Sequence, residues 1–462
     1  MKKAKIVVIG AGSASFGLKN LGAILRTSEL NECELCLVDV NEEGLILTTK
    51  LAEKINKEWN SKCIIRSSTN RCELLPDADF VILSVAIDRE KCWAIDQSIA
   101  KKYGIMHYAE NAGPGGMMHT ARNIALIMPI LRDIERLCPN AWVLNFTNPV
   151  PRICIAAARY TNVKMIGICH QMEFGYTIVG NVLAKDLGVD VKNDYLFRWN
   201  DASFETYGKL VMQTQEKVDI LAAGINHFTW MLSIKDKESG RDLYPLLRER
   251  YLSSFENFEP LTREMFDIFK VCPVPGDCHM VEYLPYTHNM SRNTWDKYDI
   301  QMYPFTDAAK DRNKMWQDIE AMVEGKQTLA SLWNVHTERA ELIIAGILNN
   351  KDSYEPAVNI SNCGFIENLP YNAIVEVPAK VNAQGVHGEK VGKLPEPIAE
   401  LCRRQITIAE MVVEASVKGD RDIALQALTL DPIIDDLGVA RSLLEDYLKE
   451  EREYLPQFFE KG

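Results

Sequence analysis

The chain has 462 residues, of which 47% are hydrophobic and 25% charged, values typical of a globular protein built from about two or three packed units. Its formal net charge of −12 argues against a nucleic-acid or anionic-membrane partner, because either would favour a basic face. No apolar run approaches the roughly 20 residues that span a bilayer, so a membrane span is not expected.

Strand-like and helical segments alternate through the first part of the chain. Such alternation predicts a mostly parallel α/β sheet with helices on both faces. The predicted strands are Lys5–Ile9, Glu34–Val40, Phe80–Ala86, Ala141–Phe146 and Lys164–Cys169, and the predicted helices lie near Phe16–Arg26, Glu42–Asn60, Asp88–Lys101, Met117–Leu137 and Pro149–Tyr160.

The first predicted strand runs into a glycine-rich turn that opens a helix. Gly10 permits the tight turn, and Gly12 lets the backbone approach a pyrophosphate at the helix N-terminus. The second strand ends at Asp39, where a carboxylate can accept from the adenosine ribose 2′-OH and disfavour the 2′-phosphate of NADP. We therefore predict that Gly10, Gly12, Ser13 and Asp39 bind NAD in a Rossmann-type doubly wound domain over residues 1–194. The alternative is a structural turn beside a strand-end acid.

Two further motifs carry polar residues. Glu110 opens the run ENAGPGG, which predicts either a simple loop or a mobile cover near the cofactor. Asn148, Cys169 and His170 stand where predicted strands end, the edge at which open α/β sheets bind ligands. An amide there suits sugar hydroxyls or a nicotinamide, and a Cys-His pair offers a soft ligand or an acid/base group, although such a pair is more often structural.

From about Tyr195 the pattern changes from alternating strands and helices to consecutive strands followed by longer helices. This change predicts a C-terminal α+β domain over residues 195–462 for substrate, metal and oligomer contacts. The two helical segments of its tail alternate in charge and predict a solvated cover for the core. The predicted strands are Tyr195–Asn200, Thr206–Met212, Asp219–Ala223 and Phe228–Ile234, and the predicted tail helices are Glu396–Val417 and Arg421–Glu450.

The twelve cysteines are scattered, which in a secreted protein would risk mispairing, so a reducing cytoplasm is the expected location. Cys33 and Cys36 have redox-motif spacing, but in a strand they would point to opposite faces. Cys272, Cys278 and His279 suggest zinc, yet no second pair has finger-like spacing, so a structural zinc site is not expected.

The ordered set GAGS, VDV, ENAGPGG, NFTNP, CHxx, GINHF and PGDCHMVEY resembles the NAD- and manganese-dependent glycoside hydrolases of family 4 over nearly the whole chain. The resemblance implies a cytoplasmic homodimer or homotetramer that acts on a small-molecule glycoside. Because His170 follows Cys169, the CHxx form resembles the branch that cleaves non-phosphorylated α-glycosides, such as glucosides, galactosides or uronides.

The resemblance also implies roles for individual residues. Cys169 and His227 would hold Mn²⁺, Asn148 would contact the sugar and the nicotinamide, and Asp277 would be the catalytic base. Apart from the resemblance, His170 is a candidate acid because the unperturbed pKa of histidine lies near neutrality, and Glu110 is a second candidate. Arg292 is a candidate substrate contact, with a surface ion pair as the alternative.

The implied mechanism departs from the two-carboxylate scheme of most glycosidases. NAD⁺ takes a hydride from C3 of the sugar, and the resulting ketone acidifies the C2 hydrogen that Asp277 removes. Mn²⁺ stabilises the enediolate charge as a Lewis acid. The aglycone then leaves from C1, water adds, and NADH returns the hydride.

Two other functions compete with this hypothesis. A 2-hydroxyacid dehydrogenase of the lactate or malate type would share the cofactor fold and consume NAD, but the sequence lacks a clear Asp/His relay with a substrate-clamping arginine. A non-catalytic NAD-sensing protein would keep Gly10, Gly12 and Asp39 without needing Cys169, His227 and Asp277 together.

Overall fold

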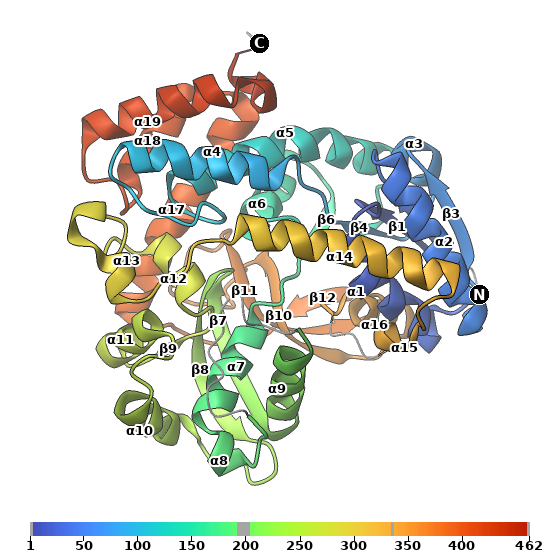
Figure 1. Cartoon of the computed structure of the whole chain (residues 1–462), viewed down its shortest axis with the longest axis horizontal. Coiled ribbons are helices and arrows are strands. Elements are labelled where there is room, and N and C mark those ends of the chain that lie inside the picture. The colour runs from blue at the N-terminus through green and yellow to red at the C-terminus, as the bar shows by residue number, and fades with distance from the viewer. Residues whose placement is uncertain (1–2, 192–203, 334–336, 460–462) are drawn as a thin grey trace.

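The computed structural model describes residues 3–191, 204–333 and 337–459. In this part of the chain a single twelve-stranded sheet has the order β3-β2-β1-β4-β5-β6-β10-β11-β7-β8-β9, with β12 paired to β11 (Figure 1). β1 to β6 pair in parallel, whereas the later strands pair antiparallel. The strands are β1 Lys5–Ile9, β2 Glu34–Val38, β3 Ile64–Ser68, β4 Phe80–Leu83, β5 Trp142–Asn145, β6 Lys164–Gly167, β7 Val218–Ile225, β8 Phe228–Asp236, β9 Cys272–Pro273, β10 Ser353–Ser361, β11 Ile374–Asn382 and β12 Gly385–Gly388.

Helices cover both faces of the parallel strands, which confirms the predicted doubly wound fold. Alternate side chains of β1 enter two different cores: Ile6 and Val8 pack on one face, Val7 and Ile9 on the other. The α-helices are α1 Ala14–Arg26, α2 Glu42–Glu58, α3 Arg71–Leu74, α4 Arg89–Lys102, α5 Gly113–Leu137, α6 Val150–Tyr160, α7 Met172–Val182, α8 Ala184–Leu187, α9 Phe204–Lys217, α10 Tyr244–Ser254, α11 Pro260–Phe269, α12 Asp277–Tyr283, α13 Thr294–Lys297, α14 Phe305–Glu324, α15 Ala330–Trp333, α16 Ala340–Asn349, α17 Glu396–Lys418, α18 Arg421–Leu430 and α19 Leu437–Glu450.

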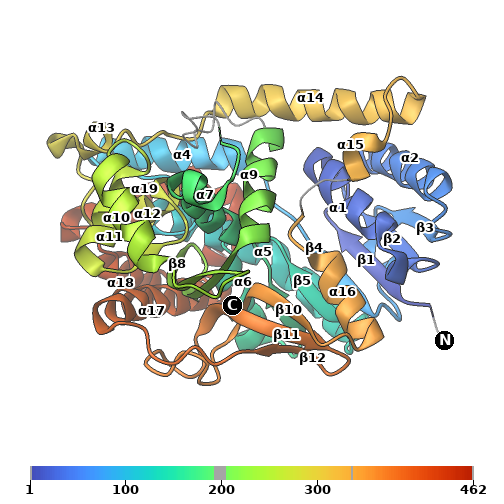
Figure 2. The same cartoon turned by 90° about the horizontal axis from the view of Figure 1, so that it is seen from below.

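Elements from the second half of the chain cover a helix layer and extend the sheet of the first half. Its helix α14 lies across α1 and α2, and Ile319 and Met322 of α14 enter the same core as Leu21 and Ile24 of α1 (Figure 2). The strand β10 adds to the edge of β6 through the pair Asn359↔Gly167. The predicted domain boundary after residue 194 falls in the range 192–203, outside the described residues, and stays a prediction.

One predicted strand is wrong. Thr206–Met212 belongs to helix α9. The buried residues of α9, Leu210, Val211 and Thr214, recur at helical spacing, and α9 packs on α7. The predicted strand Tyr195–Asn200 lies outside the described residues. The sequence pattern also missed β3, an edge strand whose side chains are largely exposed and therefore carry no alternating apolar signal.

The tail helices are more than a solvated cover. Helix α17 buries Ile398, Cys402 and Val413 against the body of the protein. No helix within the described ranges is long and apolar enough to cross a membrane.

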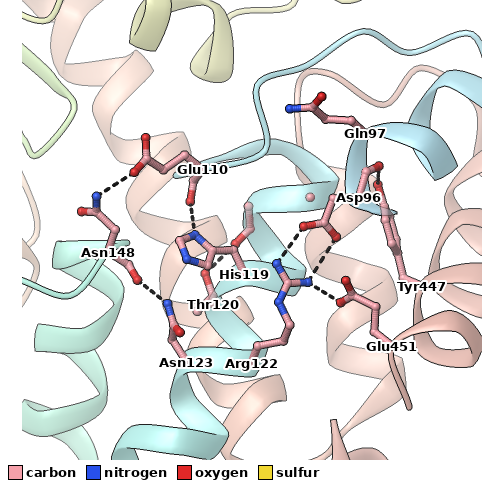
Figure 3. A network of polar contacts seen from close by, with 12 residues as sticks. Asp96, Gln97, Glu110, His119, Thr120, Arg122, Asn123, Asn148, Tyr447 and Glu451 are labelled. Atoms are coloured by element: carbon pink, nitrogen blue, oxygen red, sulfur yellow. Dashed lines mark hydrogen bonds and ion pairs between the residues drawn. The ribbon is translucent and has the colours of Figure 1, made fainter. Parts of the chain in front are cut away.

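A buried ion cluster fastens the tail to α4 and α5 (Figure 3). The Arg122 guanidinium donates from Nη2 to Asp96 Oδ2 at 2.8 Å and also contacts the Glu451 carboxylate, and all three side chains are at most 1% exposed. Tyr447 of α19 donates to the Asp96 carbonyl at 3.1 Å. Burial raises the pKa of Asp96 to about 6 and the pKa of Glu451 to about 8. One cation therefore holds two carboxyls from distant parts of the chain.

Candidate active site

The glycine-rich turn between β1 and α1 lies against the end of β2. The Gly12 amide donates to Asp39 Oδ2 at 2.8 Å, and the Asn41 amide donates to the other oxygen at 2.8 Å. A Cβ added at Gly12 would lie 2.8 Å from the Asp39 carboxyl carbon, so only glycine allows this approach. The structure thus brings Gly10, Gly12, Ser13 and Asp39 to the carboxyl end of the parallel strands, where doubly wound sheets bind ligands.

Gly10→Ala should lower the free energy of unfolding by about 2–3 kcal/mol, because the new Cβ would clash and the backbone is left-handed. Gly10 has φ 99°, and its added Cβ would lie 1.9 Å from the Ser84 carbonyl oxygen. Gly104→Ala is the matched control, since Gly104 has φ 73° with no atom within 4 Å of the added Cβ. Urea unfolding of both variants separates the two causes, because both substitutions strain a left-handed backbone and only Gly10→Ala adds a steric clash. Equal losses would mean that the contact with Ser84 costs nothing.

Cys169 and His227 are in contact beyond the carboxyl end of β6. Cys169 follows β6, His227 lies in the turn between β7 and β8, and its Nε2 is 3.2 Å from the Cys169 sulfur. His227 has φ 120°, a left-handed conformation that costs energy in a non-glycine residue and is typical of functional sites. Burial and the neighbouring His279 hold the pKa of His227 well below its ordinary value, so the imidazole is neutral. Burial, followed by the charges of Glu338 and Glu376, raises the pKa of the Cys169 thiol.

Glu110 and Asn148 face each other, and a ligand atom of Glu110 lies within 4.8 Å of one of His279, whose ring stacks on His227. Asn148 Nδ2 donates to Glu110 Oε1 at 2.8 Å, and the Asn148 carbonyl accepts from Asn123 at 2.6 Å (Figure 3). The Glu110 carbonyl lies 2.7 Å from Nδ1 of His119. Burial raises the pKa of the Glu110 carboxyl. The buried Oδ1 of Asn148 has no hydrogen-bond partner in the described structure, so it can accept from a ligand.

The segment Glu110–Gly116 is buried, which argues against the mobile cover that was one of its two predicted roles. All seven of its residues are buried, and Gly113 begins helix α5. The Glu282 carboxylate holds the segment by accepting from the amides of Glu110 and Asn111 at 2.9 and 2.5 Å. A segment fixed in this way cannot act as a mobile cover.

Sequence reasoning missed Glu282, and it considered the nearby His279 only for a structural zinc site that it did not expect. His279 Nδ1 lies 3.2 Å from Glu282 Oε1, and the His279 ring stacks on His227 at 4.4 Å between centroids. Ligand atoms of Glu110, His279 and Glu282 lie within 4.8 Å of one another. The i, i+3 spacing of His279 and Glu282 on one helical face was the available signal.

Of three further predicted residues, Asp277 is bound at the start of α11, whereas His170 and Arg292 are exposed. The oxygens of Asp277 accept from the amides of Leu261 and Thr262 at 3.0 and 2.6 Å, at the start of α11. The first amides of a helix lack partners within the helix, so a buried carboxylate is drawn to them. Burial raises the pKa of Asp277 to about 6. The side chain of His170 is 51% exposed beside Glu338, and Arg292 is exposed on the short helix Met290–Arg292.

Comparison with known proteins covers nearly the whole chain. Residues 5–187 match the model of the family 4 glycosyl hydrolases, and residues 222–434 match that of the family 4 glycosyl hydrolase C-terminal domain. The alpha-glucosidase of Erwinia rhapontici is 29% identical, with 98% of each chain covered. The "Probable 6-phospho-beta-glucosidase" of Bacillus subtilis is 30% identical, with 100% of this chain and 99% of the relative covered.

Solved structures show the same fold. A 6-phospho-alpha-glucosidase from gut microorganisms, in complex with NAD and Mn²⁺, superposes with a TM-score of 0.79 at 20% identity. The match covers 99% of this chain and 100% of that one.

Proposed function

This chain belongs to family 4 of the glycosyl hydrolases, and on that premise we propose that it hydrolyses non-phosphorylated α-glycosides with NAD and Mn²⁺ as cofactors. The observation that carries the proposal is the 3.2 Å approach of Cys169 and His227 beside the Glu110–Asn148 pair. Glycosidase activity follows from the family. The substrate class and the residue roles are the proposal.

The donor set fits a divalent transition metal. A neutral imidazole and a thiol that becomes a thiolate on coordination are ligands for such metals. Two protein ligands leave coordination positions open for substrate oxygens, as catalytic sites require. Mn²⁺ itself is proposed from the family resemblance and from the structural relative that was solved with NAD and Mn²⁺.

The turn at Gly10 and Gly12 is proposed to hold the NAD pyrophosphate, with Ser13 at the helix N-terminus. Asp39 would accept from the adenosine ribose, which favours NAD over NADP because a 2′-phosphate would meet its carboxylate. Its hydrogen bond to the Gly12 amide supports this role, because it fixes the turn before the cofactor arrives.

When bound, NAD⁺ would accept the C3 hydride of the sugar and Mn²⁺ would act as a Lewis acid on the adjacent oxygens. Asn148 would accept from a sugar hydroxyl through Oδ1 while its Nδ2 keeps hold of Glu110. Glu110, whose pKa is raised by burial, would keep a proton and donate it to the leaving oxygen. His170 is the second candidate acid, at the exposed end of the site.

Asp277 is the proposed base for the C2 proton. To act in this way it would have to release the amides of Leu261 and Thr262, which now donate hydrogen bonds to its two oxygens. Its raised pKa of about 6 favours proton uptake near neutral pH. Arg292 is proposed only as a contact to the outer part of the substrate, because it lies exposed.

Asp277→Asn should slow exchange of the C2 hydrogen with deuterated water, and slow turnover, by about 100-fold. Nuclear magnetic resonance of the substrate measures the exchange, and Asp267→Asn, an exposed carboxylate on α11, is the control. Wild-type exchange in a folded Asp277→Asn protein would remove Asp277 as base and leave it as the residue that caps α11.

The choice of a non-phosphorylated substrate rests on the residues that follow Cys169. Glu338 Oε1 lies 3.3 Å from His170 Nδ1 and close enough to Cys169 to raise its pKa. A sugar phosphate at this end of the site would meet the Glu338 carboxylate, whereas a neutral sugar hydroxyl could donate to it.

The test is release of p-nitrophenol from α-glucoside, α-galactoside and α-galacturonide substrates and from 6-phospho-α-glucoside, under reducing conditions. NAD⁺ and Mn²⁺ are omitted one at a time. We expect hydrolysis of one unphosphorylated substrate that requires both cofactors and accumulates no NADH. Hydrolysis of the 6-phospho compound alone would overturn the substrate class. NADH accumulation with a 2-hydroxyacid and no hydrolysis would instead indicate a dehydrogenase.

A further inference from the structure

A second carboxylate lies buried behind Cys169 and His227. Glu376 on β11 is 1% exposed, and four side chains surround its two oxygens. Gln171 Nε2 and Thr229 Oγ1 lie 3.0 and 2.9 Å from Oε1, whereas Asn226 Nδ2 and Asn359 Nδ2 lie 2.7 and 3.0 Å from Oε2. These neighbours come from the start of α7, from β8, from the β7–β8 turn and from β10. One carboxylate thus joins four separate parts of the chain.

This arrangement fits an ionised carboxylate that lacks a counter-charge. The NH₂ groups of Gln171, Asn226 and Asn359 can only donate, and their amide oxygens are turned away from Glu376 and have no partners in the described structure. Within residues 3–191, 204–333 and 337–459, no lysine, arginine or histidine forms an ion pair with Glu376. A buried charge that is satisfied only by neutral donors remains costly. A cation nearby would offset this desolvation cost through its attraction to the carboxylate.

The contacts of Glu376 lead directly to Cys169. The Asn226 side chain and the Gln171 backbone also act on Cys169, where both counteract the burial that raises the pKa of its thiol. Asn226 also immediately precedes His227 in the turn. The residues that Glu376 orients are therefore those that fix the sulfur and the imidazole.

We propose that Glu376 is a positioning residue for the divalent cation, whose buried negative charge stabilises the cation at Cys169 and His227 and whose hydrogen bonds fix both ligands. The inference rests on the proposed function, because that function places the cation at this pair. Carboxylates behind metal ligands orient them and strengthen metal binding in this way.

The test is titration of the full chain with Mn²⁺ alone under reducing conditions, with free Mn²⁺ measured by electron paramagnetic resonance. Glu376→Gln keeps the shape and removes the charge, so we expect Mn²⁺ affinity to fall by about 10–100-fold. The matched control is Glu355→Gln. Glu355 on β10 is a strand carboxylate of similar burial, 2% exposed, whose charge is paired with Arg339 at 2.7 Å. The control should bind Mn²⁺ within about twofold of wild type, as expected for a site without shared partners.

The outcomes separate this inference from the function on which it rests. Wild-type affinity in a folded Glu376→Gln protein would overturn the positioning role alone. If that variant does not fold, Glu376→Asp replaces it, because it keeps the charge but shortens the side chain by one carbon. It should bind Mn²⁺ several-fold more weakly, and unchanged affinity would again overturn the inference. If wild type binds no Mn²⁺, or Cys169→Ser binds it normally, the metal site of the proposed function fails and the inference falls with it.

Discussion

Cys169→Ser should reduce Mn²⁺-dependent hydrolysis to below about one thousandth of the wild-type rate. A Lewis-acid metal supplies several kcal/mol of transition-state stabilisation, and each 1.4 kcal/mol is a factor of ten in rate. Serine is close to cysteine in size but does not ionise near neutral pH, so it would leave His227 as the one remaining proposed ligand. Steady-state hydrolysis with and without Mn²⁺ measures the loss.

Binding of NAD⁺ is the internal control for this variant. The glycine turn lies between β1 and α1, Asp39 directly follows β2, and Cys169 follows β6, so the dissociation constant for NAD⁺ should stay within about twofold of wild type, as for residues without shared partners. Cys363→Ser, at an exposed cysteine, should leave hydrolysis unchanged. Full Mn²⁺-dependent activity in Cys169→Ser would refute the metal assignment, whereas loss of NAD⁺ binding would indicate a wider structural defect.

Arg122→Met should lower the free energy of unfolding by about 3–5 kcal/mol, because it leaves Asp96 and Glu451 buried without their cation. Arg136→Met on the same helix is the matched control. Arg136 pairs with Asp133 at 2.7 Å on the surface, with a side chain 62% exposed, and such pairs contribute about 0–1 kcal/mol. Urea unfolding of both variants measures the difference. A loss below about 1 kcal/mol for Arg122→Met would mean that the two carboxyls share a proton or reach water without help from the arginine.

The loss caused by Arg122→Met should also depend on pH. Burial raises the pKa of Asp96 to about 6 and of Glu451 to about 8, above the unfolded values near 4. A raised carboxyl pKa means that the folded state binds more protons, so stability falls as pH rises from about 4 to 8. Without the guanidinium both pKa values rise further. The deficit should therefore be larger at pH 8 than at pH 5, and equal deficits would argue against two carboxyls ionising in the wild-type cluster.

The sequence predicts the parallel strands other than β3 well, because these strands are apolar runs between helices of clear periodicity. β1 has its predicted bounds, and the strand predicted to end at Val40 ends at Val38, where the chain turns to present Asp39. Thr206–Met212 was predicted as a strand because its composition favours strands, and packing against α7 decides for a helix.

The candidate site could be predicted only where its residues stand next to strand ends. Cys169 and Asn148 satisfy that condition. Glu282 and Glu376 do not, because their roles arise from partners more than a hundred residues away, such as Asn111 and Gln171. For Asp277 the sequence motif predicts a catalytic role but not the position of the side chain. Its carboxylate lies at the start of α11 because the amides there donate to it.

The packing of α14 across α1 and α2 restricts how this protein can be cut. A fragment of residues 3–191 would lose the side chains of Ile319 and Met322 that cover Leu21 and Ile24, and it would expose the backbone edge of β6 that β10 now pairs with. Open strand edges and uncovered apolar faces promote self-association. A nucleotide-binding fragment made this way would therefore aggregate rather than report cofactor affinity. Affinity for each ligand has to be measured on the intact polypeptide, and fusion partners belong at its ends.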